Sequence, residues 1–222
     1  MKLELKNINK SFFIEKKELK ILKDINLSLD SGQITALVGP SGSGKTTLLQ
    51  IAALLDNPTS GKVIFGRKSL SDSNDKDRTE FRKKNIGFIY QDHNLLPEFT
   101  AIENIIMPLL IQKIDKKTAL KKGEEILEKI ALKDKRDIFP YELSGGQQQR
   151  ISIARAIISK PKIIFADEPT GNLDSKNSKN IFQIFYDFTK EFNINSLIVT
   201  HNMALAQKMD QIIKIEDGKI SN

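Results

Sequence analysis

The chain has 222 residues, of which 39% are hydrophobic and 28% charged, and its formal net charge is +7. This length fits one well-cored domain, and the absence of cysteine excludes disulfides, thiolate metal sites and a cysteine nucleophile. The longest apolar run, Ile105–Ile111, is too short to cross a bilayer, and the alternating, charged N-terminal residues predict no secretory signal.

The first third of the chain predicts two kinds of strand. Alternating apolar residues at Leu3 and Leu5, and again over Ile25–Leu29, are typical of half-buried strands in an antiparallel layer. Ile34–Val38 is instead a short, continuous apolar strand that runs into a glycine-rich loop. Further along we expect a buried helix over about 45–55, a surface loop over 69–77, and strands at 63–65 and 86–90.

The pattern changes after residue 91. Most of the segment 92–160 is predicted to be helical, because its apolar residues recur three and four positions apart. After Pro161 strands and helices alternate again, which indicates a mainly parallel sheet covered on both faces. The expected elements there are a strand at 163–166, an amphipathic helix around 181–192, a strand at 196–200, and a hairpin over 212–220 that turns at Asp217-Gly218.

The loop after the strand Ile34–Val38 has the composition of a phosphate-binding loop. Its glycines let consecutive backbone N–H groups point at phosphate oxygens, and the following helix start adds a positive dipole end. Lys45 supplies a cation for the β- and γ-phosphates, and Thr46 supplies a hydroxyl for Mg²⁺. The predicted nucleotide-binding residues are Gly39, Pro40, Ser41, Gly42, Ser43, Gly44, Lys45, Thr46 and Thr47.

Polar residues also follow three of the other predicted strands. After 163–166 come Asp167, expected to hold Mg²⁺ through water, and Glu168, expected to act as general base on the attacking water. His201 follows the strand 196–200, and we expect it to contact the γ-phosphate because ligands bind at this edge of parallel sheets. Gln91 is a candidate for orienting water or binding Mg²⁺, whereas His93 is expected to be loop surface.

Ser144-Gly145-Gly146 opens a second predicted helix, over about 147–159. A serine followed by two unhindered glycine amides at a helix start is another anion site. A single nucleotide does not need two such sites, so one of them is expected to serve a nucleotide held by a second copy of the chain.

These motifs, in this order and spacing, resemble those of the ATP-binding subunits of ABC (ATP-binding cassette) transporters, and the resemblance covers nearly the whole chain. It implies a RecA-like P-loop α/β core (1–91 and 161–222) with a mainly parallel sheet, an antiparallel β layer and an inserted helical subdomain (92–160). It also implies a head-to-tail dimer that sandwiches two ATP molecules with Mg²⁺, with the Gly39 loop of one copy facing Ser144 and Gly146 of the other. Asp174, in the segment Asn172-Leu173-Asp174, would lie at the dimer interface.

At two positions this sequence differs from the residue that is common in the family. Phe12 stands where the family stacks an aromatic ring on adenine, often tyrosine, and Phe13 is the alternative. Asn202 stands where aspartate usually follows the histidine, so a charge is lost there while the histidine is kept.

The segments 90–110 and 166–174 resemble most closely the ATPase subunit of the lipoprotein-releasing transporter of Gram-negative bacteria, while macrolide-efflux and cell-division relatives share less of the first. The resemblance implies a peripheral subunit on the cytoplasmic face of the inner membrane, with two integral membrane subunits contacting residues after Gln91. That apolar segment also suits an ordinary core helix. The dispersed lysine pairs predict no nucleic-acid partner. The competing hypotheses are the ATPase of a macrolide-type efflux or cell-division ABC system, a soluble, nucleic-acid-linked ABC ATPase, and a nucleotide-gated regulator with little hydrolysis.

Overall fold

The computed structural model describes residues 1–15, 17–171 and 173–221, and the chain forms two compact units. The first unit contains residues 1–82 and 195–222, and the second contains residues 83–194. The helical segment expected over 92–160 therefore falls within the second unit.

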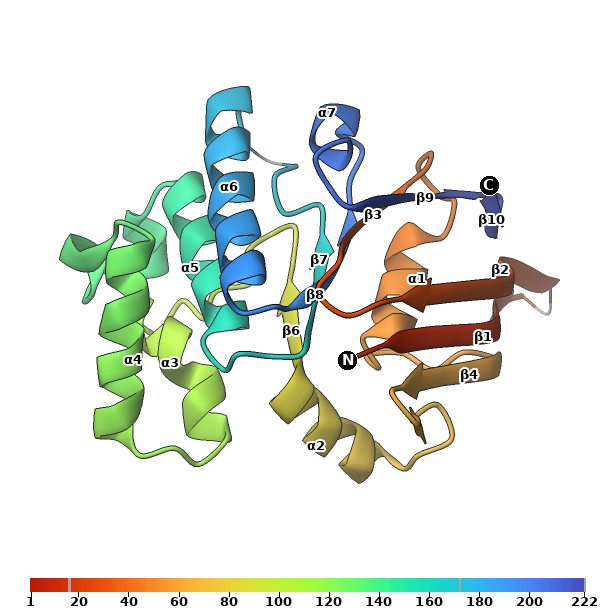
Figure 1. Cartoon of the computed structure of the whole chain (residues 1–222), viewed down its shortest axis with the longest axis horizontal. Helices are drawn as coiled ribbons and strands as arrows, with labels where there is room; N and C mark the ends of the chain where they lie inside the picture. The colour runs from red at the N-terminus through yellow and green to blue at the C-terminus, as the bar shows by residue number, and fades with distance from the viewer. Residues whose placement is uncertain (16, 172, 222) are drawn as a thin grey trace. The chain divides into compact units, whose positions relative to one another are not determined.

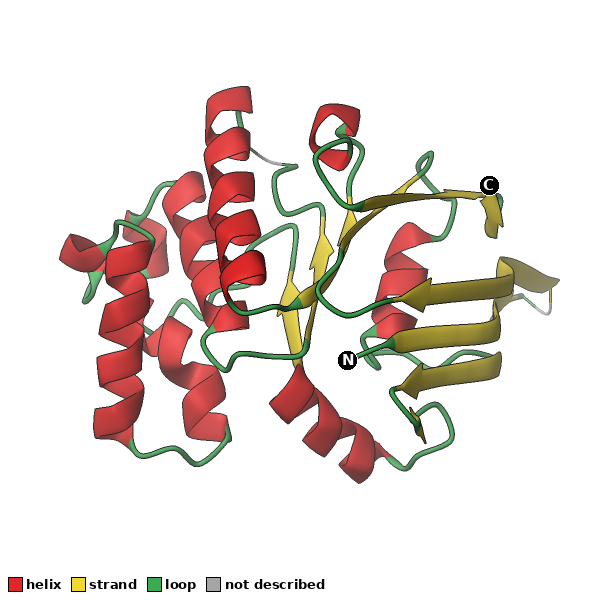
Figure 2. Cartoon of the chain, viewed as in Figure 1, coloured by secondary structure: helices red, strands yellow, loops and turns green. Residues whose placement is uncertain are grey.

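An antiparallel sheet occupies the N-terminal part of the first unit (Figures 1 and 2). Its strand order is β2 (Lys17–Leu29), β1 (Leu3–Ile14), β4 (Ser60–Phe65) and β5 (Lys68–Ser69). Leu3 pairs with Leu29 and Leu5 with Leu27, so the alternating apolar residues of both strands are buried on one face. The predicted antiparallel layer is confirmed.

The first unit also contains a set of parallel strands. β3 (Ile34–Val38) lies between β8 (Asn195–Val199) and β9 (Gln211–Glu216) and is parallel to both, while β10 (Lys219–Ser221) returns antiparallel to β9. All residues of β3 and β8 are buried, including the polar Thr35, Asn195 and Ser196, and the rest of both strands is apolar, as expected of buried parallel strands. The helix α1 (Lys45–Ala52) contacts both β2 and β8 and so links the two sheets of this unit.

Two helices here differ from expectation. α1 ends before residue 55, because Leu54 has a left-handed φ of +60° that cannot continue a helix. α2 (Asp75–Asn85) begins inside the expected surface loop, where Asn74 Oδ1 accepts a hydrogen bond from the Asp77 backbone N–H at 2.9 Å. A further short helix, α7 (Met203–Ala206), follows β8 and was not predicted.

The second unit combines a strand pair with four helices (Figure 1). β6 (Ile86–Ile89) and β7 (Ile163–Asp167) are parallel, and α5 (Gly145–Ile157) packs on β6. α3 (Ala101–Ile111) contacts both α4 (Lys116–Lys129) and α5, and α5 also contacts α6 (Ser175–Glu191). Two 3₁₀ turns, Lys133–Lys135 and Pro140–Glu142, connect α4 to α5.

Candidate functional site

The glycine-rich loop, residues 39–47, joins β3 to α1 as expected. A side chain at Gly39 would overlap the carbonyl oxygen of Ile215 on β9, so the loop lies directly against that strand. Gly44 has a φ of +101°, and a Cβ there would lie 2.8 Å from the Leu22 side chain on β2. Glycine is therefore required at both ends of the loop, by close packing and by backbone conformation.

The interior of this loop carries a cation and a hydroxyl group. Lys45 Nζ donates hydrogen bonds to the carbonyl oxygens of Gly39 (3.0 Å) and Pro40 (2.8 Å), which holds the buried ammonium within the loop. The buried Ser43 hydroxyl has no hydrogen-bond partner among residues 1–15, 17–171 and 173–221. The loop thus carries a buried ammonium and a buried hydroxyl, the two kinds of donor that its predicted phosphate-binding role requires.

The remaining loop residues are accessible. Pro40, Ser41 and Gly42 are exposed, Thr46 is exposed in the first turn of α1, and Thr47 is half-buried. The Thr46 hydroxyl is therefore open to a metal ion at the mouth of the loop, as its predicted role requires.

His201 lies at the same sheet edge as the loop. The parallel pairing of β3 and β8 has Leu37 opposite Val199, so Gly39 and His201 each stand two residues beyond this pair. The His201 side chain is exposed. Asn202 begins α7, and its Oδ1 accepts a hydrogen bond from the Leu205 backbone N–H at 3.2 Å. An aspartate could make the same cap, so the asparagine loses a charge without losing the helix start.

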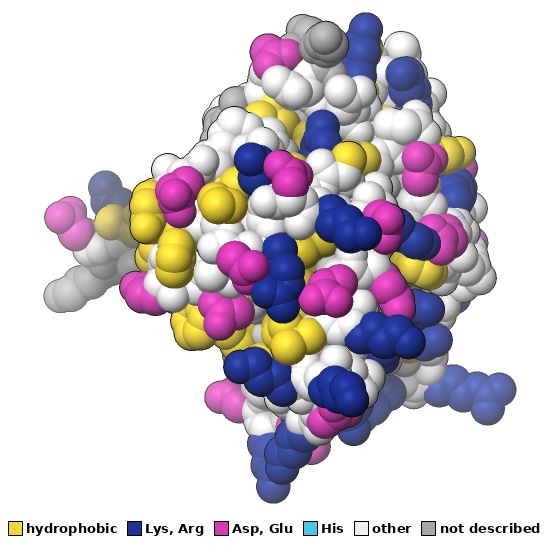
Figure 3. Space-filling model, turned by 90° about the vertical axis from the view of Figure 1, so that its left-hand side faces the viewer, with side chains coloured by type: hydrophobic (Ala, Val, Ile, Leu, Met, Phe, Trp, Pro, Cys, Tyr) yellow, Lys and Arg dark blue, Asp and Glu magenta, His cyan; other side chains and the backbone are white. Residues whose placement is uncertain are grey.

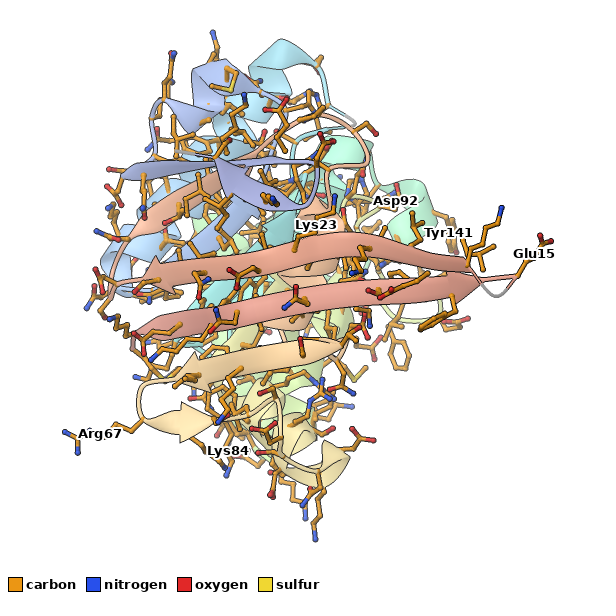
Figure 4. The ribbon with its side chains drawn as sticks, turned by 90° about the vertical axis from the view of Figure 1, so that its right-hand side faces the viewer. Glu15, Lys23, Arg67, Lys84, Asp92 and Tyr141 are labelled. Atoms are coloured by element: carbon orange, nitrogen blue, oxygen red, sulfur yellow. The ribbon has the colours of Figure 1, made fainter. Side chains whose placement is uncertain are left out.

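The β1–β2 hairpin shows which of the two phenylalanines faces the loop. The Lys10 ammonium lies 5.0 Å from the centroid of the Phe12 ring, so these two side chains lie on the same side of β1, whereas Phe13 is 75% exposed. Lys10 pairs with Leu22, the residue that packs on Gly44. Phe12, with 43% of its surface exposed, is therefore on the face of the hairpin that carries the phosphate-loop contact. Figure 4 shows Glu15 at the outer end of this hairpin and Lys23 further back along β2.

In the second unit, β6 and β7 end together. Ile89 pairs with Ala166, so Gln91 and Glu168 each stand two residues beyond this pair, and Asp167 is the last residue of β7. Asp167 and Glu168 are half-buried, and Gln91 is exposed. The three polar residues predicted around these strands therefore leave the same edge of the strand pair.

The second anion site begins α5 two residues earlier than predicted. The Ser144 hydroxyl accepts a hydrogen bond from the Gln147 backbone N–H (3.4 Å), and Gln147 Oε1 accepts one from the Ser144 backbone N–H (2.9 Å). This reciprocal cap fixes the helix start, so the Gly145 and Gly146 amides lie in the first turn, at the positive end of the helix dipole.

Two further loops lie against this helix start. A Cβ on Gly145 would be 3.9 Å from both His93 Nε2 and Leu173 Cδ2, and one on Gly146 would be 3.8 Å from Asn177. Asp174 caps α6, because its Oδ1 accepts a hydrogen bond from the Asn177 backbone N–H at 3.0 Å. Asn172, from the same predicted segment, lies outside the described residues.

His93 differs from the expectation of loop surface. Its ring is half-buried, and its Nδ1 meets the side-chain oxygen of the buried Gln149 on α5. Arg155, also on α5, donates to the carbonyl oxygens of His93 (2.8 Å) and Asn94 (2.7 Å). Burial lowers the pKa of the Arg155 guanidinium, which nevertheless stays charged as arginines do. These contacts tie the segment after Gln91 to the helix that starts at Ser144.

A known protein family and its curated members match this chain in sequence. The family described as ABC transporter matches residues 22–171. The lipoprotein-releasing system ATP-binding protein LolD of Rickettsia felis is 47% identical over 219 residues, covering 99% of this chain and 97% of that protein. LolD 1 of Rhodospirillum rubrum is 44% identical over 218 residues, covering 98% and 96%.

Solved structures extend the agreement to the fold. The dimeric ATP-binding cassette MJ0796, in a post-hydrolysis state bound to ADP and Pi, superposes with a TM-score of 0.92 and 36% identity over 99% of this chain and 97% of that one. This likeness confirms the predicted P-loop α/β fold with its antiparallel layer and helical insertion. The chain therefore belongs to the ABC transporter family.

Proposed function

We propose that this chain is the ATP-hydrolysing subunit of an ABC transporter that releases lipoproteins from a membrane. The observation that carries the ATP-binding part is the loop at 39–47, which holds a buried ammonium against its own carbonyl oxygens beside the buried Ser43 hydroxyl. Relatives called lipoprotein-releasing system ATP-binding proteins, which this chain matches over almost their whole length, support the transport role.

The phosphates of ATP would be bound by the loop amides and by Lys45. Phosphate oxygens accept stronger hydrogen bonds from an ammonium than carbonyl oxygens do, so Lys45 can exchange its present partners for the nucleotide. Thr46, Asp167 and Gln91 are the proposed Mg²⁺ ligands, directly or through water. Bound Mg²⁺ would neutralise charge on the phosphates during transfer.

Hydrolysis would then depend on two side chains at strand ends. Glu168 would accept a proton from water as the water oxygen attacks the γ-phosphorus, and ADP would leave with the electron pair of the broken P–O bond. His201 would donate a hydrogen bond to the γ-phosphate and so orient it for attack. Both residues stand two positions beyond a buried, paired strand, which fixes their backbones.

A second copy of the chain would complete each active site. The helix start at Ser144-Gly145-Gly146 offers backbone amides to an anion, and in a head-to-tail dimer that anion would be the γ-phosphate held by the partner's loop. Asp174 would lie at this interface. The dimeric MJ0796 structures support such an assembly. A single copy should accordingly bind ATP but hydrolyse it slowly.

The segment after Gln91 is the proposed contact with two integral membrane subunits, which would hold the chain at the cytoplasmic face of the inner membrane. Leu96, Phe99 and Ile111 of this segment are large apolar side chains left exposed. A cavity of about 320 Å³ adjoins it, lined by Leu109 and Gln112 together with residues of α4, α5 and α6. None of the described helices is long and apolar enough to cross a membrane, so attachment through partners is required by this proposal.

One face of the chain, over the residues that the structure describes, lacks the basic stripe that the nucleic-acid hypothesis requires (Figure 3). On the face that α4 covers, Figure 3 shows Lys and Arg side chains interspersed with Asp, Glu and hydrophobic ones. A nucleic-acid surface would present a continuous basic stripe. Salt-dependent binding of DNA or RNA by the purified protein would revive that hypothesis.

Mixing two inactive variants tests the shared active site. Lys45→Ala disables the phosphate loop, and Gly146→Asp places a carboxylate at the second anion site. If the site is shared, a mixed dimer contains one site with both defects and one intact site, so an equal mixture should recover about a quarter of wild-type ATPase activity. If each chain hydrolyses alone, the mixture will stay inactive.

A further inference from the structure

Lys10 is a nearly buried cation on β1 that makes three contacts. Its side chain is 11% exposed, and its Nζ lies 2.7 Å from Asp56 Oδ2 and donates to the Asn57 carbonyl oxygen at 2.7 Å. The same ammonium lies 5.0 Å from the centroid of the Phe12 ring, within the range of a cation–π interaction. A buried lysine with three partners is held in one position, unlike the dispersed surface lysines.

The acceptors of Lys10 belong to a rigid segment just beyond α1. Arg78, itself buried, donates to the carbonyl oxygens of Leu54 (2.8 Å) and Asp56 (3.2 Å), and its second nitrogen meets the Asn57 side chain. Cations at this end of α1 are favourable, because the carboxyl end of a helix carries the negative end of its dipole. Lys10 is therefore anchored on a segment that other hydrogen bonds already fix.

α1 is attached to the hairpin at both of its ends. At its N-terminus, Gly44 packs on Leu22 of β2, and beyond its C-terminus Asp56 pairs with Lys10 of β1. Because α1 begins with Lys45 of the phosphate loop, these attachments set the distance between that loop and the Phe12 ring. The Lys10 ammonium lies over the Phe12 ring, which nevertheless keeps 43% of its surface exposed.

We propose that Lys10 is a positioning residue for the nucleotide base, which acts by holding the Phe12 ring in place for stacking against adenine. This inference rests on the proposed function, since it requires that ATP occupy the phosphate loop. Lys10 does not touch the nucleotide. It limits the rotation of the Phe12 side chain, so the ring is already oriented when the base arrives.

The test compares ATP with inorganic triphosphate, which lacks the base. Lys10→Met keeps a long, unbranched side chain but removes the ammonium, and we expect it to weaken ATP binding about 2- to 10-fold while triphosphate affinity stays constant. Lys6→Met is the matched control, because Lys6 is on the same strand but 54% exposed in a surface pair with Glu4. Its ATP affinity should equal that of the wild type.

A double mutant shows whether Lys10 acts through Phe12. Phe12→Ala alone should weaken ATP binding, and adding Lys10→Met should then change it no further, because the ring that Lys10 orients is gone. Additive effects of the two substitutions, or an equal loss for triphosphate, would overturn the inference. If Lys10→Met is unstable beside an unpaired Asp56, Lys10→Met with Asp56→Asn removes both charges and gives the same comparison.

The two proposals fail in different ways. A wild-type chain that binds neither ATP nor triphosphate would refute the proposed function. A wild-type chain that binds ATP well, with Lys10→Met unchanged, would refute the role of Lys10 alone.

Discussion

The backbone N–H of Gly171 donates a hydrogen bond to the carbonyl oxygen of Glu168 at 2.9 Å, and a Cβ on Gly171 would lie 3.1 Å from Glu168 Oε2. The turn after β7 thus leaves its proposed general base little room to move. Glu168 itself has a left-handed φ of +44°, a backbone conformation that side-chain-bearing residues rarely adopt. Such outliers cluster at functional sites.

Gly171→Ala should therefore impair hydrolysis without impairing nucleotide binding. The added methyl would press on the Glu168 carboxylate and displace it, and a shift of this kind should lower kcat about tenfold while KM changes little. Steady-state ATPase kinetics measure this. A loss confined to KM would mean that Glu168 is not the group displaced.

Glu168→Gln should bind ATP and retain the closed dimer while losing about 10²–10⁴-fold in turnover, because the amide cannot accept the proton of the attacking water. Size-exclusion chromatography with ATP and an ATPase assay give the two readouts. Turnover at the wild-type rate would rule out Glu168 as the base.

Ser43→Ala should lower the affinity for ATP without lowering the stability of the fold. Removing a buried hydroxyl that lacks a partner among the described residues should leave the free energy of unfolding unchanged or slightly higher, whereas ATP affinity should fall about tenfold. Ser196→Ala is the matched control, since the Ser196 hydroxyl is also buried without a described partner but lies on β8, away from the loop. Equal ATP affinity in the two variants would remove Ser43 from the site.

Arg155→Met should make the segment after Gln91 more mobile. The carbonyl oxygens of His93 and Asn94 lose a charged donor, which should cost about 1–3 kcal/mol in the free energy of unfolding. Amide hydrogen exchange over residues 92–96 should become faster. Arg136→Met is the control, because its guanidinium pairs with the exposed side chains of Glu124 and Asp137, and unchanged exchange in both variants would contradict the prediction.

Acid should weaken the start of α3 through Glu103. Hydrogen bonds from the backbone and hydroxyl of Thr100 lower the pKa of Glu103 below its ordinary value of 4.5. A lowered pKa means that the carboxylate stabilises the fold above pH 4.5. This stabilisation is lost as the pH falls through the pKa that Glu103 has in the folded protein. Glu103→Gln should therefore be less stable than wild type at pH 7, by about 0.2–0.5 kcal/mol because solvent screens this carboxylate, and equal to it in strong acid, as urea unfolding would measure. A difference that persists at low pH would assign the effect to packing.

The sequence predicts the position of a site residue where that residue directly follows a strand that the sequence also predicts. Gly39, Gln91, Glu168 and His201 each follow a continuous apolar run, and the end of a buried parallel strand is a fixed point. Their positions depend on the pairing of strands that can be recognised from their apolar residues.

Other parts of the structure have no recognisable pattern in the sequence. α2 has a single strongly apolar residue, Phe81, and buries Arg78 instead, so no apolar stripe marks it as a helix. The position of His93 depends on Gln149 and Arg155, which are more than fifty residues away in sequence. Long-range contacts between polar side chains have no periodicity that a sequence can show.

The turn at Asp217-Gly218 has a practical consequence for work with this protein. The Gly218 backbone N–H donates to the Ser43 carbonyl oxygen at 3.2 Å, and its own carbonyl accepts from Lys23 at 2.8 Å, so the β9–β10 hairpin braces the phosphate loop from outside. The β9–β10 turn thus supports the proposed nucleotide-binding loop. A tag or fluorescent protein joined close to β10 should therefore be separated from it by a long flexible spacer.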